Sequence, residues 1–191
     1  MTKSSLTGVK STYIALLRGI NLGGHKIVKM EQLRKAFGDL GFDDVKTYIQ
    51  SGNVVFKSSR QPCESLAKRI EEKVLGQFGF PVPVVVKTTD EIGAVIKNNP
   101  LLKEKGIDAS KLHITFLSCA PEKSLLKALD GFAAAPDQFR CSSQAIYLHC
   151  PNGYHETKLG NNVLMKMLKV GTTTRNWKTV NQLYEMSSEK R

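Results

Sequence analysis

The fold is decided by residues 47–56, which read TYIQSGNVVF and place a turn between two short strand-like runs. Over residues 45–50, the β-branched residues Val45, Thr47 and Ile49 alternate with Lys46, Tyr48 and Gln50. Such alternation is typical of a strand with two unlike faces. Ser51 and Gly52 form a turn signal, and residues 53–57 are a second run rich in β-branched residues. The sequence therefore predicts an antiparallel hairpin at this point of the chain.

A helix and a strand flank this hairpin on each side. Apolar side chains recur every three or four residues over 30–40 and every four over 66–78, which predicts two helices. Residues 12–17 and 82–87 are strand-like, and Pro83 favours a sheet edge for the latter. The order β-α-β-β-α-β is that of a ferredoxin-like unit, whose helices cover one face of an antiparallel sheet. The predicted fold class is therefore α+β.

The rest of the chain repeats most of this order. Strands are expected at 111–118, 138–141 and 145–150, and helices begin at Pro121 and near Leu159. A terminal helix, with Thr174 as its N-cap, is expected where the last strand would stand. The prediction is thus a second ferredoxin-like subdomain that is incomplete and ends in a C-terminal helix.

The domain prediction has three parts, which are a ferredoxin-like subdomain over 1–88, a connecting helix and loop over 89–110, and a second α+β subdomain with a C-terminal helix over 111–191. A small open sheet has a second apolar face that must be covered. Either the second subdomain or another copy of the chain would serve.

Composition limits the class of protein. The 191 residues include 28 Lys and Arg against 17 Asp and Glu, so the net charge is +11, and hydrophobic residues make up 41%. Such a chain is too apolar to be disordered. The longest apolar run, residues 13–17, is far shorter than the roughly 20 residues that span a bilayer, so no membrane partner is expected.

Cysteine usage and the first ten residues favour a cytoplasmic protein. The four cysteines have neither the spacing of a zinc site nor the density of a disulfide scaffold, so reduced thiols are the simplest expectation. Residues 1–10 lack the apolar core of a signal peptide. No metal and no cofactor are predicted.

Three stretches carry a resemblance to a known family. They are LLRGINLGG at residues 16–24, TYIQSGNVVF at 47–56, and TTRNW at 173–177 followed by Thr179 and Val180. The chain resembles, over about residues 12–185, the bacterial domain of unknown function catalogued as number 1697. The resemblance implies a soluble protein with two α+β subdomains, and the family has no established activity to transfer.

The predicted topology brings two of these stretches together. Strands 1 and 2 of a β-α-β-β-α-β unit run the same way, so residues 18–24 and 50–53 should lie at one end of the sheet, beside the N-terminus of the first helix. Backbone N–H groups and basic side chains would meet there, which predicts an anion-binding corner. The candidate ligand-binding residues are Arg18, Asn21, Gly23, Gly24, Lys26, Gln50, Ser51, Asn53, Arg175 and Asn176.

A purely structural interpretation of these residues is also open. The glycines would permit positive φ in a long loop, and Gln50 and Asn53 would bond nearby backbone groups. Arg175 is expected in the first turn of the terminal helix, where the helix dipole disfavours a cation. We therefore expect Arg175 to have a specific partner, either a carboxylate or a ligand.

Three functional hypotheses follow. The leading one is a binding module for an anionic, phosphate-bearing ligand at this corner. The alternatives are a non-specific nucleic-acid-binding protein, since the positive charge is spread along the chain, and an enzyme acting on a small phosphorylated substrate. Residues 19–26 depart from the nucleotide-binding pattern G-x-x-x-x-G-K-[ST] at His25 and Lys26, and no catalytic motif is present, so enzymatic activity is left open.

Overall fold

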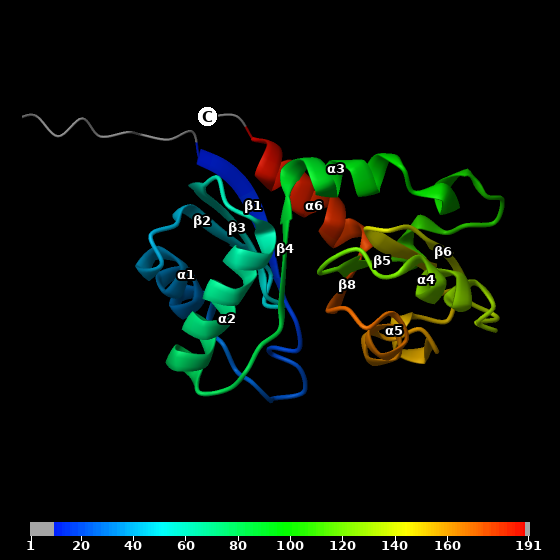
Figure 1. Ribbon diagram of the computed structural model, residues 1–191, viewed down its shortest axis with the longest axis horizontal. Helices are drawn as coiled ribbons and strands as arrows, with labels where there is room; N and C mark the ends of the chain where they lie inside the picture. Colours follow the sequence, from blue (N-terminus) through cyan, green and yellow to red (C-terminus); the bar gives the residue numbers. More distant parts are fainter. Residues whose placement is uncertain (1–9, 190–191) are drawn as a thin grey trace, which may run out of the picture.

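The computed structural model describes residues 10–189, whose strands form two four-stranded antiparallel sheets. The first sheet has the strand order β2-β3-β1-β4 (Figure 1). Its elements are β1 (Lys10–Leu17), α1 (Met30–Asp39), β2 (Asp43–Tyr48), β3 (Asn53–Ser59), α2 (Cys63–Phe78) and β4 (Val84–Thr88). Pro83 directly precedes β4, which is an edge strand as predicted.

The second sheet repeats the arrangement in the order β6-β7-β5-β8. Its elements are β5 (Leu112–Leu117), α4 (Lys123–Asp130), β6 (Gln138–Cys141), β7 (Ala145–His149), α5 (Asn161–Leu168) and β8 (Thr172–Asn176). Helix α3 (Thr89–Lys97) and two short 3-10 helices, η1 (Pro100–Lys103) and η2 (Ala109–Lys111), connect the halves, and η3 (Tyr154–Glu156) precedes α5. Helix α6 (Trp177–Ser188) ends the described chain.

The α+β class with two βαββαβ-type subdomains is confirmed, but the second subdomain is not incomplete. Strand β8 pairs with β5, with Thr173 opposite Phe116, and α6 follows it rather than replacing it. Three consecutive threonines favour the extended backbone because their β-branched side chains restrict χ1. The helix accordingly begins later than predicted. Its N-cap is Asn176, whose Oδ1 accepts a hydrogen bond from Thr179 N at 2.8 Å.

Both faces of each sheet are buried. Along β1, Ala15 and Leu17 face the layer of α1 and α2, whereas Ile14 and Leu16 face a central layer shared with the second sheet. This burial on both faces explains why residues 13–17 are continuously apolar. Figure 1 shows α6 between the two sheets, with α1 and α2 outside the first and α5 outside the second.

The central layer joins the two halves into one core. It contains Ile92 of α3, Phe116 of β5 and Val180 of α6 together with the inner side chains of β1. The second half therefore covers the open face of the first sheet, as one of the two alternatives predicted. The boundaries at residues 88 and 111 stay a prediction, because α3 and α6 contribute to the layer that both halves share. Within residues 10–189, no helix combines the length and apolarity needed to cross a membrane.

Candidate functional site

The two polar segments that follow β1 and β2 lie side by side, as the topology predicts. Leu17 N donates a hydrogen bond to Gly52 O at 2.8 Å, and Asn21 Nδ2 donates to Gln50 O at 2.8 Å. Gly52 has φ of +76°, and a Cβ there would lie 2.7 Å from Cβ of Leu17. This close approach requires glycine, and it fixes the loop after β1 against the β2–β3 turn.

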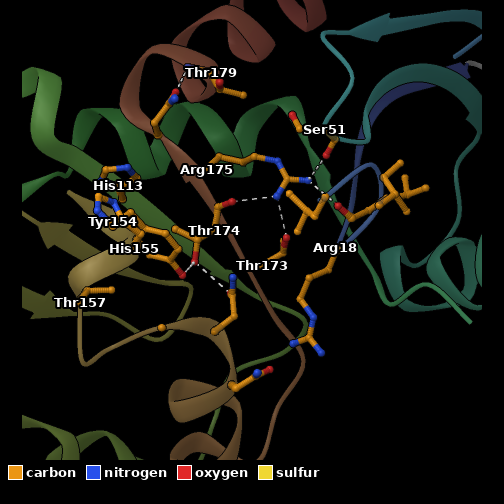
Figure 2. Close-up of a pocket in the computed structure, with 18 of the residues that line it drawn as sticks. Arg18, Ser51, His113, Tyr154, His155, Thr157, Thr173, Thr174, Arg175 and Thr179 are labelled. Atoms are coloured by element: carbon orange, nitrogen blue, oxygen red, sulfur yellow. Dashed lines mark hydrogen bonds between the residues drawn. The ribbon is translucent and has the colours of Figure 1, made fainter. Parts of the chain in front are cut away.

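An open cleft of about 800 Å³ separates this corner from the second half of the chain (Figure 2). One side is formed by the loop after β1 and the β2–β3 turn. The other side is formed by η3, the start of α5 and strand β8. The lining residues are Leu17, Arg18, Gly19, Ile20, Leu22, Ile49, Ser51, His113, Tyr154, His155, Thr157, Lys158, Gly160, Asn161, Asn162, Val163, Thr173, Thr174, Arg175, Asn176 and Thr179.

The charged side chains of the cleft are all basic. Arg18, Lys158 and Arg175 line it, and none of the lining residues within the described chain is aspartate or glutamate. Arg18 is half-buried, and its Nη1 donates to Thr172 O at 3.3 Å, across the seam between the halves. Lys158 is exposed at the far side. The lining side chains therefore carry positive charge and no carboxylate, while the Glu156 carboxylate, next in the chain, lies 3.3 Å from the ring of the lining His155.

Arg175 lies at the centre of this arrangement and ties four segments together. It is 9% exposed, and its guanidinium donates only to neutral acceptors. These are Leu17 O at 2.7 Å, Thr174 O at 2.8 Å, Thr173 Oγ1 at 2.9 Å, Ser51 O at 3.2 Å, Gly52 O at 3.5 Å and Asn53 Oδ1. The donors are satisfied, but the charge is not neutralised.

This environment differs from the one expected for Arg175. The residue lies in β8, directly before the N-cap of α6, rather than in the first turn of that helix. Its partners are backbone carbonyls and side-chain oxygens rather than a carboxylate. Burial lowers the pKa of the Arg175 guanidinium to about 10, so the group is still cationic at neutral pH.

A chain of neutral hydroxyl groups forms the opposite wall. Tyr154 Oη donates to Thr174 Oγ1 at 2.9 Å, and Thr174 Oγ1 donates in turn to Asn161 Oδ1 at 3.0 Å. The ring of His113 stacks on Tyr154, with centroids 5.1 Å apart. Burial raises the pKa of Tyr154, so its hydroxyl keeps its proton at neutral pH. This wall adds polar groups to the cleft without adding negative charge.

The N-terminus of α5 also opens into the cleft. Its N-cap, Gly160, has no side chain to bond the first N–H groups, and Asn161 and Asn162 follow it along the lining. The first N–H groups of a helix lack intrahelical partners and carry a partial positive charge. The helix start therefore adds to the positive potential of Arg18, Lys158 and Arg175.

Four of the ten predicted site residues line the cleft. These are Arg18, Ser51, Arg175 and Asn176. Asn176 also caps α6, so its Oδ1 already accepts a hydrogen bond from the backbone. Of the predicted first-half corner, Arg18 and Ser51 thus lie on one wall of the cleft, and the N-terminus of α1, which was expected beside them, does not line it.

The other six serve the architecture of the corner or lie outside the cleft. The Asn21 amide bonds both Val28 and Gln50, and Asn53 is fully buried beneath Arg175. Lys26 Nζ donates to Pro81 O at 3.0 Å, away from the cleft. Gly23, Gly24 and Gln50 are exposed and do not line it.

Sequence reasoning missed the wall supplied by the second half. This wall consists of His113, Tyr154, His155, Thr157, Lys158, Gly160, Asn161, Asn162, Val163, Thr173, Thr174 and Thr179. Only the packing of the two sheets brings it opposite Arg18, so no local pattern could have located it. The one available signal was the polar stretch 173–177, which the family resemblance had already marked. In the part of the chain that the structure describes, no three His, Cys, Asp or Glu side chains gather as a metal site.

The half-buried His113 of the cleft predicts a pH effect on stability. Burial lowers the pKa of His113 below its ordinary value of 6.5, so the folded protein binds this proton less readily than the unfolded chain. The free energy of unfolding should therefore decrease as the pH falls from 7 to 5. Urea denaturation at both pH values should show a smaller decrease in His113→Gln than in the wild type. An equal decrease in both proteins would contradict the assignment, and the exposed His155→Gln serves as the control.

Comparisons with known proteins find a matching family model and a similar solved structure. A family model described as "Protein of unknown function (DUF1697)" matches residues 11–147. The solved structure of conserved bacterial protein SP0830 from Streptococcus pneumoniae is similar, with a TM-score of 0.71 and 22% sequence identity, over 94% of this chain and 100% of that one. At this identity the likeness concerns the fold alone. No curated protein matches the chain.

Proposed function

We propose that this chain, which belongs to the DUF1697 family of proteins of unknown function, is a binding protein for an anionic, phosphate-bearing ligand held in the cleft. The observation that carries the proposal is the positive cleft without a carboxylate, with Arg175 buried at its floor. Burying a charge without a partner is costly, so buried cations in proteins are normally paired with an anion. A ligand phosphate would supply that missing negative charge.

The basic residues would act on the ligand in two ways, through direct hydrogen bonds and through electrostatic attraction at a distance. Arg175 already donates to protein oxygens, so it would act on the ligand through its charge. Within residues 10–189, Arg18 makes its contacts through Nη1, which leaves Nε and Nη2 to donate to a phosphate. The N–H groups at the start of α5 and the Lys158 ammonium would approach the same anion from the opposite wall.

Isothermal titration calorimetry tests this proposal by measuring the dissociation constant of inorganic phosphate at low ionic strength. Arg18→Gln should weaken binding about 10-fold or more, because a hydrogen bond to a charged group contributes about 1.5–3 kcal/mol. Gln50→Ala is the matched control, since Gln50 is a polar residue of the same corner that lies outside the cleft. Absence of phosphate binding by the wild type, or equal affinity in Arg18→Gln, would refute the proposal.

The net charge of +11 supports a second candidate, non-specific nucleic-acid binding. It makes a different prediction, because scattered lysines would share the contacts. Binding of labelled single-stranded RNA, followed by anisotropy, should then fall steeply with salt and respond little to Arg18→Gln. RNA binding of that kind, with no affinity for phosphate, would favour this candidate over the cleft.

A further inference from the structure

We infer that the ligand of the cleft is an organic phosphate whose ester group is apolar, so that the site recognises an apolar body as well as an anion. This inference rests on the proposed function and names its ligand class. Seven large hydrophobic side chains are exposed within residues 10–189, and three of them line this one cleft. They are Leu22, Ile49 and Val163, with exposed fractions of 64%, 53% and 36%.

These three side chains come from separate elements and line the same cleft. Leu22 lies in the loop after β1, Ile49 in the β2–β3 turn and Val163 in the first turn of α5. Single exposed apolar side chains are normal on a protein surface. Three of them around one cationic cleft form a patch, and such patches commonly mark a binding site. A ligand that carried both charge and apolar surface would cover them while its phosphate reached Arg18.

The apolar side chains are presented by ordered backbone. The loop after β1 is closed by a bridge between Leu22 and His25 and by a hydrogen bond from Asn21 N to Lys26 O at 3.1 Å. Ile49 has φ of +46°, a conformation that β-branched residues rarely adopt. A β-branched residue held in this conformation, with its side chain in solvent, is better explained by a role at the cleft than by packing.

The size of the cleft agrees with such a ligand. A volume of about 800 Å³ falls within the range of sites for small organic molecules, and a lone phosphate would occupy little of it. The stacked rings of His113 and Tyr154 also line the cleft and add aromatic surface to it. The cleft thus combines an anionic subsite with apolar and aromatic walls.

Calorimetric titrations of the full chain with inorganic phosphate and with phenyl phosphate test this inference. The wild type should bind phenyl phosphate at least 10-fold more tightly than inorganic phosphate. The double variant Leu22→Ser with Ile49→Asn should lose most of that preference and keep its affinity for inorganic phosphate. Asparagine is chosen because it tolerates positive φ, so the turn is retained. Leu102→Ser, a change at a 47% exposed leucine of η1 outside the cleft, should leave the preference intact.

The outcomes separate this inference from the proposed function. Equal binding of the two ligands by the wild type, or a full preference retained by the double variant, would overturn the apolar subsite and leave the phosphate site standing. A double variant that changed only the oligomeric state would assign Leu22 and Ile49 to contact with another copy, which also overturns it. Failure of both ligands to bind would instead refute the proposed function.

Discussion

Arg175→Lys is expected to lower the free energy of unfolding by about 3 kcal/mol, although the charge is retained. The planar guanidinium donates in several directions at once, to Leu17 O on one side and to Thr174 O on the other. An ammonium at the end of a lysine side chain cannot span these acceptors. Buried oxygens would then lose their donors, at a cost of about 1–3 kcal/mol each.

Urea denaturation followed by circular dichroism measures this effect. The urea concentration at the midpoint of unfolding should fall. The dependence of the unfolding free energy on urea concentration should change little, since both proteins expose the same surface on unfolding. Arg140→Lys is the control, because Arg140 is exposed and pairs with Glu104 at 2.8 Å, and it should stay within about 0.5 kcal/mol of the wild type. A loss below about 1 kcal/mol in Arg175→Lys would show that the guanidinium network does not join the segments.

Gly52→Ala is expected to destabilise the protein by about 2–4 kcal/mol. A methyl group there would lie 2.7 Å from Cβ of Leu17, and Leu17 is 1% exposed and packed in the core of the first half. Overpacking of this kind typically costs about 1–3 kcal/mol, and an alanine with positive φ costs about 1 kcal/mol more. The strain would also push the β2–β3 turn away from the loop that carries Arg18.

Urea denaturation of Gly24→Ala separates the cost of overpacking from the cost of placing an alanine at positive φ. Gly24 has φ of +80°, close to that of Gly52, but a Cβ there would meet nothing within 4 Å. It should therefore lose only the conformational part, about 1 kcal/mol. Equal losses in the two variants would mean that the close approach of the turn to β1 carries no energy, and would contradict the account of the corner.

The sequence predicted the fold well where local patterns carry the information. The hairpin around Gly52 and the strand at residues 12–17 follow from residue types and spacing, and the structure confirms both. The failure at β8 has a physical cause. Thr174 suits an N-cap by residue type as well as Asn176 does, so the start of the helix was predicted too early. The strand is defined by its pairing with β5, which the local sequence does not show.

Only one of the two walls of the candidate site could be predicted from the sequence. Topology placed residues 18–24 against 50–53, because both positions belong to one sheet and its connections. The opposite wall depends on how two sheets pack through the shared layer of α3 and α6, which no spacing in the sequence encodes. Asn21 and Asn53 bond backbone groups, which is the structural alternative that the sequence left open for Asn53.

A nuclear magnetic resonance titration tests most directly whether an anion is held between Arg18 and the start of α5. Phenyl phosphate added to ¹⁵N-labelled protein should shift the amide signals of residues 160–163 and 173–176 together with those of Arg18 and Ser51. Signals from the layer of α1 and α2 should stay in place. Shifts spread over exposed lysines around the molecule, with residues 160–163 unmoved, would contradict the claim.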